Sequence, residues 1–256
     1  MLRGVDLKVF TCESEWDAML SCIYDAYSSG LGHKNIRLMT EPVGQMNLFD
    51  DYIHITSDSD KAMKMMDAIN IKISQEFYRE MAFTAMAFEE DALDNIYHML
   101  ILGFAYGPKI LDMLQYKDVV RNREIRTRVM REAERFRESI RFHQVGNVYV
   151  AHIEPKSRVT AYLGPAFQDR MQSENFMIID DVHLEAVIHK ADRNYYIRKL
   201  NEDELCKVKK TEEINDGFTD LWKIFFNAIA IKERENYKCQ LNHSPKWARK
   251  HIVEFL

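Results

Sequence analysis

Glycine and proline are scarce in this chain of 256 residues, which contains nine glycines and five prolines. Average proteins contain about 12% of the two residues together. So small a share leaves room for few glycine-rich loops of the kind that hold phosphate groups. The sequence also lacks the P-loop, dinucleotide-binding, zinc-protease and nucleophile-elbow motifs. It therefore gives no support to the nucleotide-binding and hydrolase families that these motifs define.

Long apolar runs and paired cysteines are missing too. The longest apolar stretch, Met99–Tyr106, is far shorter than the ~20 residues of a membrane span. The amino terminus has no apolar run of signal-peptide length, so we expect a cytoplasmic protein. The four cysteines are scattered outside any C-x-x-C spacing, which predicts reduced thiols and no iron–sulfur cluster: Cys12, Cys22, Cys206 and Cys239.

The overall composition is that of a folded, mildly acidic protein. Hydrophobic residues make up 46% and charged residues 29%, and the formal net charge is −5. These values exclude a disordered or collagen-like chain. The negative charge argues against a protein that nucleic acid wraps completely, but it allows local basic patches.

The first half of the chain is predicted to be mainly helical. A strand at 7–12, a helix from Ser14 to Tyr27 and a strand at 52–56 form a small βαβ piece, and residues 28–50 read as a surface loop. Apolar residues then recur at helical spacing from residue 57 to 141, with one stop at Gly107-Pro108. A long arginine-rich helix, at about 117–139, closes this part.

The second half changes to the spacing of strands. A hairpin at 140–153 turns at Gly146-Asn147, and a helix at 159–171 precedes three strands at 176–179, 184–189 and 195–200. A helix at 212–235 and a short one opened by Pro245 follow. We therefore predict an α+β fold with a mainly helical part at 1–139 and an antiparallel-sheet part with carboxyl-terminal helices at 140–256, either as two domains or as one continuous domain.

The arginine-rich helix is the largest electrostatic feature. Residues 121–141 contain eight arginines and four glutamates around an apolar stripe that includes Ile125 and Phe136. Guanidinium groups bind phosphates, which predicts nucleic-acid contacts by Arg121, Arg128, Arg131, Arg135 and Arg141. The alternative is an ordinary surface helix, because glutamates stand three or four residues before several of these arginines.

The carboxyl end carries a second basic segment in which aromatic residues alternate with cations. Such a segment suits the stacking of bases together with phosphate contacts, through Lys232, Arg234, Lys246, Trp247 and Arg249. It equally suits a docked terminal helix whose lysine stems cover an apolar strip.

Metal ligands and catalytic acids are less clearly marked. His183 and His189 bracket a strand, and His152 shares a strand face with Glu154. Neither pair has a third ligand in register, so we predict no metal site and no cofactor, and these four residues are the ligands to test first if a metal is found. Asp180-Asp181 follows an apolar strand, where both turns and catalytic sites occur, and we interpret it as a turn.

Four segments resemble a bacterial family assigned to DNA repair or DNA metabolism, and the similarity runs from Val9 to the end of the chain. They are residues 129–142 (VMREAERFRESIRF), 153–155 (IEP), 163–170 (LGPAFQDR) and 221–234 (LWKIFFNAIAIKER). The family is defined by its link to a radical SAM protein, and some relatives are fused to a uracil-DNA glycosylase domain. The resemblance implies a role beside DNA enzymes; it implies no catalytic residues.

The chain departs from the family pattern at four places. Glu134 stands where relatives carry histidine, Ala166-Phe167 replaces H-F, and Ile179-Asp180 replaces I-H-D. The closing M-P-x-R-Y-W becomes residues 244–249 (SPKWAR). If those histidines and that aromatic pair form a site in relatives, this chain has lost or altered it.

Three functions follow from these observations. The leading hypothesis is an accessory protein, not itself an enzyme, that binds DNA and positions a partner such as the radical SAM protein or a glycosylase. The first alternative is an enzyme acting on damaged DNA, a glycosylase or nuclease that uses Asp180, Asp181 or Glu154. The second is a protein-interaction module without DNA contact.

A short motif suggests one further partner. Gln45, Leu48 and Phe49 match the pattern Q-x-x-L-F, which resembles the peptide by which bacterial polymerases and repair proteins bind the sliding clamp. Pro42 and Gly44 keep this segment out of regular structure, so it can extend from the body. In the alternative, Leu48 and Phe49 fold back and fix the loop to the core.

Overall fold

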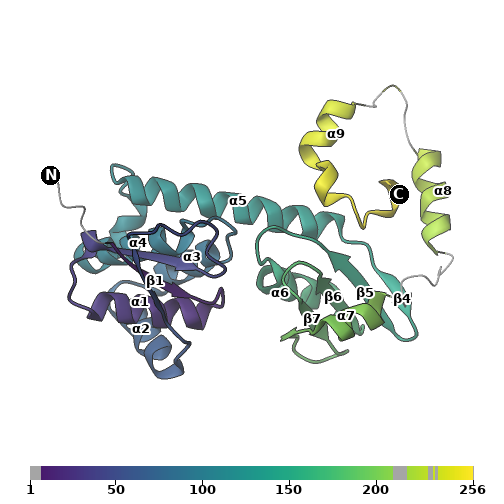
Figure 1. Ribbon diagram of the computed structural model, residues 1–256. Coiled ribbons are helices and arrows are strands. Elements are labelled where there is room, and N and C mark those ends of the chain that lie inside the picture. The colour runs from purple at the N-terminus through teal and green to yellow at the C-terminus, as the bar shows by residue number, and fades with distance from the viewer. Residues whose placement is uncertain (1–6, 210–217, 230–232, 234–235, 256) are drawn as a thin grey trace. The chain divides into compact units, whose positions relative to one another are not determined.

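The computed structural model describes residues 7–209, 218–229, 233 and 236–255 (Figure 1). The chain separates into two compact units, residues 1–130 and 131–256. We call them the amino-terminal and the carboxyl-terminal unit. Helices and strands occur in both, which confirms the α+β class.

A three-stranded parallel sheet, in the order β2-β1-β3, lies in the amino-terminal unit. Its strands are β1 (Lys8–Cys12), β2 (Ile36–Thr40) and β3 (Asp51–His54), and α1 (Trp16–Ser28) connects β1 to β2. The prediction of a surface loop over 28–50 is wrong for 36–40, because Ile36, Leu38 and Met39 are buried in the core. Strand β2 is only five residues long, and its alternation of Ile36, Arg37 and Leu38 ends at the buried Met39, so the pattern is too short to mark a strand.

Four helices complete the amino-terminal unit. They are α2 (Ser59–Lys72), α3 (Gln75–Ala85), α4 (Ala92–Tyr106) and the first part of α5 (Lys117–Ser139). Side-chain caps fix two of the starts: Asp58 accepts hydrogen bonds from the amides of α2, and Ser74 accepts one from the amide of Phe77. The helices bury one continuous core that includes Phe77, Ile96 and Tyr97.

The carboxyl-terminal unit contains a five-stranded sheet in the order β4-β5-β6-β7-β8. Its strands are β4 (His143–Val145), β5 (Val148–Ile153), β6 (Phe176–Asp180), β7 (Glu185–His189) and β8 (Tyr196–Lys199). The predicted antiparallel arrangement fails at one pair, because β5 and β6 run parallel. The helix α6 (Thr160–Arg170) connects them, and such a crossover brings the second strand back in the direction of the first.

Helices cover both faces of this sheet. Ala133 and Phe136 of α5 pack with α6 against one face, and Leu205 of α7 (Glu202–Lys209) packs on the other. The predicted helix at 212–235 is observed as α8 (Phe218–Ile229), and its remaining residues apart from Glu233 lie outside the described part. Then come α9 (Tyr237–His243), a 3₁₀ turn at Lys246–Ala248 that follows Pro245, and a last 3₁₀ turn at Val253–Phe255. The sequence patterns did not predict α7 or α9.

Candidate functional site

The parallel pair β5–β6 places two acidic residues side by side. Ile153 and Asp180 are register partners at the ends of these strands, so the next residues, Glu154 and Asp181, leave the same edge of the sheet. The amide of Asp181 donates to the carbonyl of Ile153 at 3.0 Å and holds the two chain segments together. The carboxyl ends of parallel strands are a common place for binding sites, and this edge is where the acids meet.

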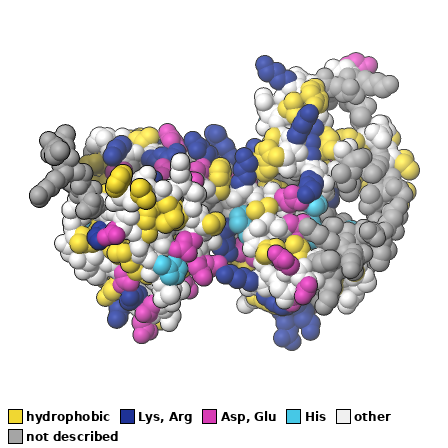
Figure 2. All heavy atoms as spheres, in the orientation of Figure 1, with side chains coloured by type: hydrophobic (Ala, Val, Ile, Leu, Met, Phe, Trp, Pro, Cys, Tyr) yellow, Lys and Arg dark blue, Asp and Glu magenta, His cyan; other side chains and the backbone are white. Residues whose placement is uncertain are grey.

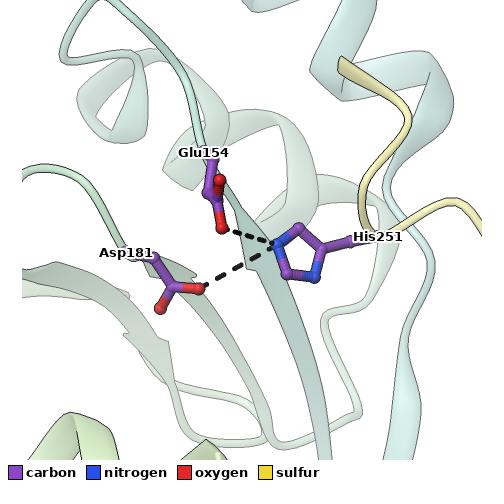
Figure 3. A group of neighbouring side chains, drawn as sticks. All are labelled: Glu154, Asp181 and His251. Atoms are coloured by element: carbon purple, nitrogen blue, oxygen red, sulfur yellow. Dashed lines mark hydrogen bonds and ion pairs between the residues drawn. The ribbon is translucent and has the colours of Figure 1, made fainter. Parts of the chain in front are cut away.

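His251 completes a three-residue group from a distant part of the sequence. Its Nε2 lies 3.4 Å from Oε1 of Glu154 and 3.9 Å from Oδ2 of Asp181 (Figure 3). The ligand atoms of the three residues all lie within 4.8 Å of one another, which suits a metal ion. We call Glu154, Asp181 and His251 the acid–histidine cluster.

Further charged and aromatic side chains support the cluster. His152 of β5 is buried, and its Nδ1 lies 3.0 Å from Oδ1 of Asp181. The centroid of its ring lies 6.4 Å from that of His143 and 5.9 Å from that of His251. Lys250 forms an ion pair with Glu154. Burial raises the pKa of Glu154, but the hydrogen bonds and charges of Lys250 and His251 outweigh it, so the pKa lies below its ordinary value.

A buried glutamate positions the chain that follows Glu154. Glu132 of α5 is 6% exposed and accepts hydrogen bonds from the amides of Lys156, at 2.7 Å, and Ser157, at 3.2 Å. Both oxygens of the carboxylate are used, so the loop after β5 is fixed to the helix at two consecutive residues. Glu132 is therefore a positioning residue for Glu154 and Lys156.

Two cations lie over the ring of an exposed tryptophan next to the cluster. The guanidinium of Arg135 and the ammonium of Lys156 lie 5.5 and 5.4 Å from the ring of Trp247, which is 38% exposed. Arg135 also donates to the carbonyl of His243 at 3.2 Å. Two further exposed cations are their neighbours in the chain, Arg131 one helical turn before Arg135 and Lys246 directly before Trp247. We group these residues as the Trp247 surface: Arg131, Arg135, Lys156, Lys246 and Trp247.

The Trp247 surface and the acid–histidine cluster share a small pocket. Trp247, Lys250, His251 and Glu154 all line it. Part of the arginine-rich helix and part of the carboxyl-terminal basic segment thus meet within one unit. An aromatic ring beside cations and acids is a combination that can hold a base, its phosphate and a metal ion.

Other arginines of α5 are committed to ion pairs. In the amino-terminal unit, Arg121 forms two hydrogen bonds of 2.7 Å with Asp91, and Arg128 lies 3.2 Å from Glu89. The bidentate contact with Arg121 lowers the pKa of Asp91. Figure 2 shows this mixture of basic and acidic side chains along α5. For these two arginines the geometry fits the ordinary surface helix better than a free phosphate site.

Two more of the predicted nucleic-acid contacts, Arg141 and Arg249, are engaged by partners within the protein. Arg141 pairs with Glu254 at 2.5 Å and lies over the ring of Trp222. Arg249 donates to the carbonyl of Ser244 and lies 4.2 Å from the ring of Phe255. Lys232 and Arg234 lie outside the described residues.

Of the four histidine and glutamate candidates for a metal, only Glu154 belongs to the cluster. His183 pairs with Asp180 at 2.6 Å, and His189 lies 2.9 Å from the carbonyl of Glu174 and stacks on Phe176. Asp180 also accepts hydrogen bonds from the amides of Val182 and His183, which agrees with the interpretation of this position as a turn. Burial raises the pKa of Asp180, and His183 offsets part of that effect.

Asp181 could be recognised as a candidate from the sequence, whereas His251 could not. Asp181 is one of the acids of the enzyme hypothesis, and the parallel pairing that places it beside Glu154 is what the patterns missed. His251 has no sequence signal, since it follows Glu154 by about a hundred residues and lies in no strand or helix. Gln45, Leu48 and Phe49 lie elsewhere, in the loop between β2 and β3.

Comparisons with known proteins identify a family and a distant structural likeness. Residues 90–254 match the profile of a domain of unknown function, DUF4130, which spans well over half of the chain and the whole acid–histidine cluster. No curated protein matches. A solved structure, the pGpG-specific phosphodiesterase PggH from Vibrio cholerae, is 10% identical over 81% of this chain and 97% of its own, and its TM-score of 0.32 is too low to carry an argument. None of the described helices is long and apolar enough to cross a membrane.

Proposed function

The chain belongs to the DUF4130 family, a domain of unknown function, and we propose that it is a DNA-binding accessory protein of DNA repair or DNA metabolism. One observation carries the proposal: Trp247 is exposed, and two cations, Arg135 and Lys156, lie over its ring at 5.5 and 5.4 Å from the centroid. Bases stack on such rings, and guanidinium and ammonium groups bind the adjoining phosphates. The resemblance to a DNA-repair family supports the same reading.

Single-stranded DNA is the substrate class that fits this surface best. An indole can stack only on a base that is free of its partner strand, and each stacked base contributes about 1–3 kcal/mol. Because the net charge of the protein is −5, only the local cations of this surface can attract the DNA phosphates. The affinity for DNA should therefore fall steeply with added salt. Duplex DNA offers phosphates but no unstacked base, and we expect it to bind more weakly.

Fluorescence anisotropy with a labelled single-stranded oligonucleotide tests the proposal. Trp247→Ala should lower the affinity at all salt concentrations, and Arg135→Ala with Lys156→Ala should also reduce the salt slope by about 0.7 for each phosphate that the protein no longer neutralises. The matched control is Lys190→Ala with Arg193→Ala, which removes two exposed cations at the opposite end of β7 from Glu185. Equal affinity of the parent and all three variants would refute DNA binding at this surface.

An exposed apolar face on α8 supports the second half of the proposal, that the protein positions a partner enzyme. Leu221, Ile224, Phe225 and Ile229 recur at helical spacing and are 52–66% exposed. Apolar faces of this kind mark protein contacts, and α8 lies in one of the segments that resemble the DNA-repair family. The radical SAM protein, or a glycosylase, is the partner that we propose.

Co-elution of the two purified proteins on size exclusion tests this part. Leu221→Asp with Phe225→Asp should abolish the complex, because charges then occupy the apolar face. Ile71→Asp places a charge at an even more exposed apolar position on α2 and should leave the complex intact. A parent protein that elutes separately from both enzymes would contradict the proposal.

The acid–histidine cluster favours a second candidate function, metal-dependent hydrolysis of a phosphodiester. Two carboxylates and one imidazole within 4.8 Å form a ligand set that leaves positions open for water and a phosphate oxygen. A bound divalent cation would supply Lewis-acid activation of water, and Lys250 is placed to contact an anionic substrate. This candidate is the nuclease alternative, with Glu154 and Asp181 as the acids.

Calorimetric titration with Mn²⁺ separates the two candidates. The hydrolytic function requires binding by the parent protein, loss of binding in Asp181→Asn, and Mn²⁺-dependent cleavage of single-stranded DNA. Asp169→Asn, at an exposed carboxyl on α6, is the control and should bind like the parent. DNA binding without Mn²⁺ binding or cleavage would contradict the hydrolytic function and support the accessory function.

A further inference from the structure

The loop between β2 and β3 exposes two large apolar side chains at its tip. Leu48 is 91% exposed and Phe49 is 83% exposed, the two highest values for large hydrophobic residues in the described part of the chain. Met46, beside them, is 60% exposed. These values exclude the alternative in which Leu48 and Phe49 fold back onto the core.

Polar contacts at the base of the tip hold it in place. The amide of Asn47 donates to the hydroxyl of Tyr52 at 2.8 Å, and its side-chain nitrogen donates to Asp50 at 2.9 Å. The amide of Asp50 lies 3.4 Å from the carbonyl of Asn47, which closes a turn with Leu48 and Phe49 at its two central positions. The turn thus presents both side chains to solvent by its own construction.

The tip has the form of a ligand for a pocket. Two adjacent apolar side chains on an ordered turn lose little conformational entropy when they are buried, so most of the hydrophobic gain becomes binding free energy. Two such side chains are too few for an obligate interface of standard size, and they suit a transient contact with one concave site. Gln45, three residues before Leu48, supplies an amide donor and acceptor for the rim.

We propose that residues 45–49 are the docking segment through which this protein binds the apolar peptide pocket of a bacterial sliding clamp. The spacing of Gln45, Leu48 and Phe49 fits such a pocket, and the exposure of both anchors leaves them accessible without unfolding. The choice of partner rests on the proposed function, because a ring that encircles DNA is where a DNA-bound accessory protein would meet it. The physical form of the docking segment is independent of that function.

The acidic neighbours of the tip add a condition on the partner. Asp50 and Asp51 follow Phe49 directly, and Lys8 is paired with Asp51. A pocket with a basic or neutral rim would accept this segment, and an acidic rim would repel it. The docking segment also lies outside residues 90–254, so it is a feature of this chain in addition to the family domain.

Binding of the purified 256-residue chain to the purified clamp encoded by the same genome tests the proposal, by calorimetry and without DNA. Leu48→Ala with Phe49→Ala should weaken binding by at least about tenfold, because the two anchors would be hot spots of a small interface. Met63→Ala with Ile71→Ala removes two other exposed apolar side chains, 55% and 82% exposed on α2, and should not change the affinity. A peptide of residues 43–51 should compete with the parent protein.

Each other result has a defined meaning. A parent protein that does not bind the clamp overturns the proposal, as does a double variant that binds as the parent does. Self-association of the parent that the double variant abolishes, without clamp binding, would assign the tip to a second copy of the chain and also overturn it. Because DNA is absent, these outcomes do not depend on the Trp247 surface, and loss of DNA binding would leave them unchanged.

Discussion

At the scale of single residues, Glu132 shows how one side chain can determine a site that it does not belong to. Its carboxylate accepts hydrogen bonds from the backbone amides of Lys156 and Ser157, in the loop that follows Glu154. Both hydrogen bonds are formed by an ionised acceptor in a buried environment, where an unsatisfied amide is costly. Stability and site geometry therefore depend on the same residue.

Glu132→Ala should lower the free energy of unfolding by about 2–4 kcal/mol, since two charge-assisted hydrogen bonds are removed and the buried amide of Ser157 is left without its acceptor. Urea denaturation measures the change. Glu132→Gln keeps one carbonyl acceptor and should fall between the parent and the alanine variant. If the alanine variant were as stable as the parent, Glu132 would not fix the loop.

The pKa of Glu154 gives a pH dependence of known sign. Lys250 and His251 favour the ionised form and outweigh burial, so the folded-state pKa lies below the ordinary value. The contribution to stability is then present above the ordinary pKa of a glutamate and is lost as the pH falls through the lower, folded-state pKa. Glu154→Gln should be less stable than the parent at pH 7, with a difference that disappears in acid.

Denaturation midpoints of the two proteins between pH 7 and pH 3 check this expectation. Glu138→Gln changes an exposed carboxyl of α5 and serves as the control. A difference between parent and Glu154→Gln that stays constant over this range would show that Glu154 does not titrate as its contacts imply.

At the scale of helices and strands, α6 is the element that sets the direction of β6. Its packing against Tyr195, the residue directly before β8, depends on Gly164, where a Cβ atom would lie 2.5 Å from Cε2 and 2.7 Å from Cδ2 of the Tyr195 ring. A ring edge cannot move aside as a flexible side-chain end can. Gly164 is thus required by close approach and not by backbone conformation.

Gly164→Ala should destabilise the protein by about 1–3 kcal/mol, the range for overpacking a filled contact. In the double variant with Tyr195→Ala, the alanine at 164 should cost much less, because the ring that it meets is absent. Urea denaturation of the four proteins in this cycle measures the coupling. Equal costs with and without the ring would mean that the helix and the ring do not meet as described.

At the scale of the whole molecule, two compact units with separate cores predict two separate unfolding events. The core of the first unit includes Phe77 and Ile96, and that of the second includes Phe167 and Phe176. We expect Gly164→Ala to speed amide hydrogen exchange in β5, β6 and β7 and to leave exchange in β1 and β2 unchanged. Mass spectrometry of peptic fragments resolves the two regions. Faster exchange in both units would indicate one cooperative domain, the other option predicted from the sequence.

Much of this architecture could be predicted from the sequence, because most helices have one apolar stripe and most strands are short apolar runs between polar turns. The stripe of α5 is correct at Ile125, Val129 and Phe136, which are all buried. The patterns failed at β2, whose alternation at Ile36, Arg37 and Leu38 is too short to be recognised, and at β5–β6. The helix predicted between those two strands is a crossover connection, which implies a parallel pair, and the antiparallel prediction did not take it into account. Short helices such as α7 and α9 contain too few turns for a stripe to be recognised.

The candidate site was only half predictable for a related reason. The sequence identified Trp247, Glu154 and Asp181 as residues of interest, since aromatic and acidic residues next to cations or strand ends are unusual. It could not identify His251, because tertiary packing alone brings it to Oε1 of Glu154. The arginines of α5 could not be divided in advance, because their partners Asp91 and Glu89 are neighbours in space and not in helical register.

The two cations over the ring of Trp247 also make this residue an optical reporter. Anionic quenchers such as iodide collect near Arg135 and Lys156, so the emission of this exposed indole should be quenched more strongly by iodide than by neutral acrylamide. The indole of Trp16 is instead held in a hydrogen bond to the hydroxyl of Tyr78. With Trp222 replaced by Phe, a bound oligonucleotide should repel iodide and protect the signal of Trp247, so that occupancy could be followed without a label.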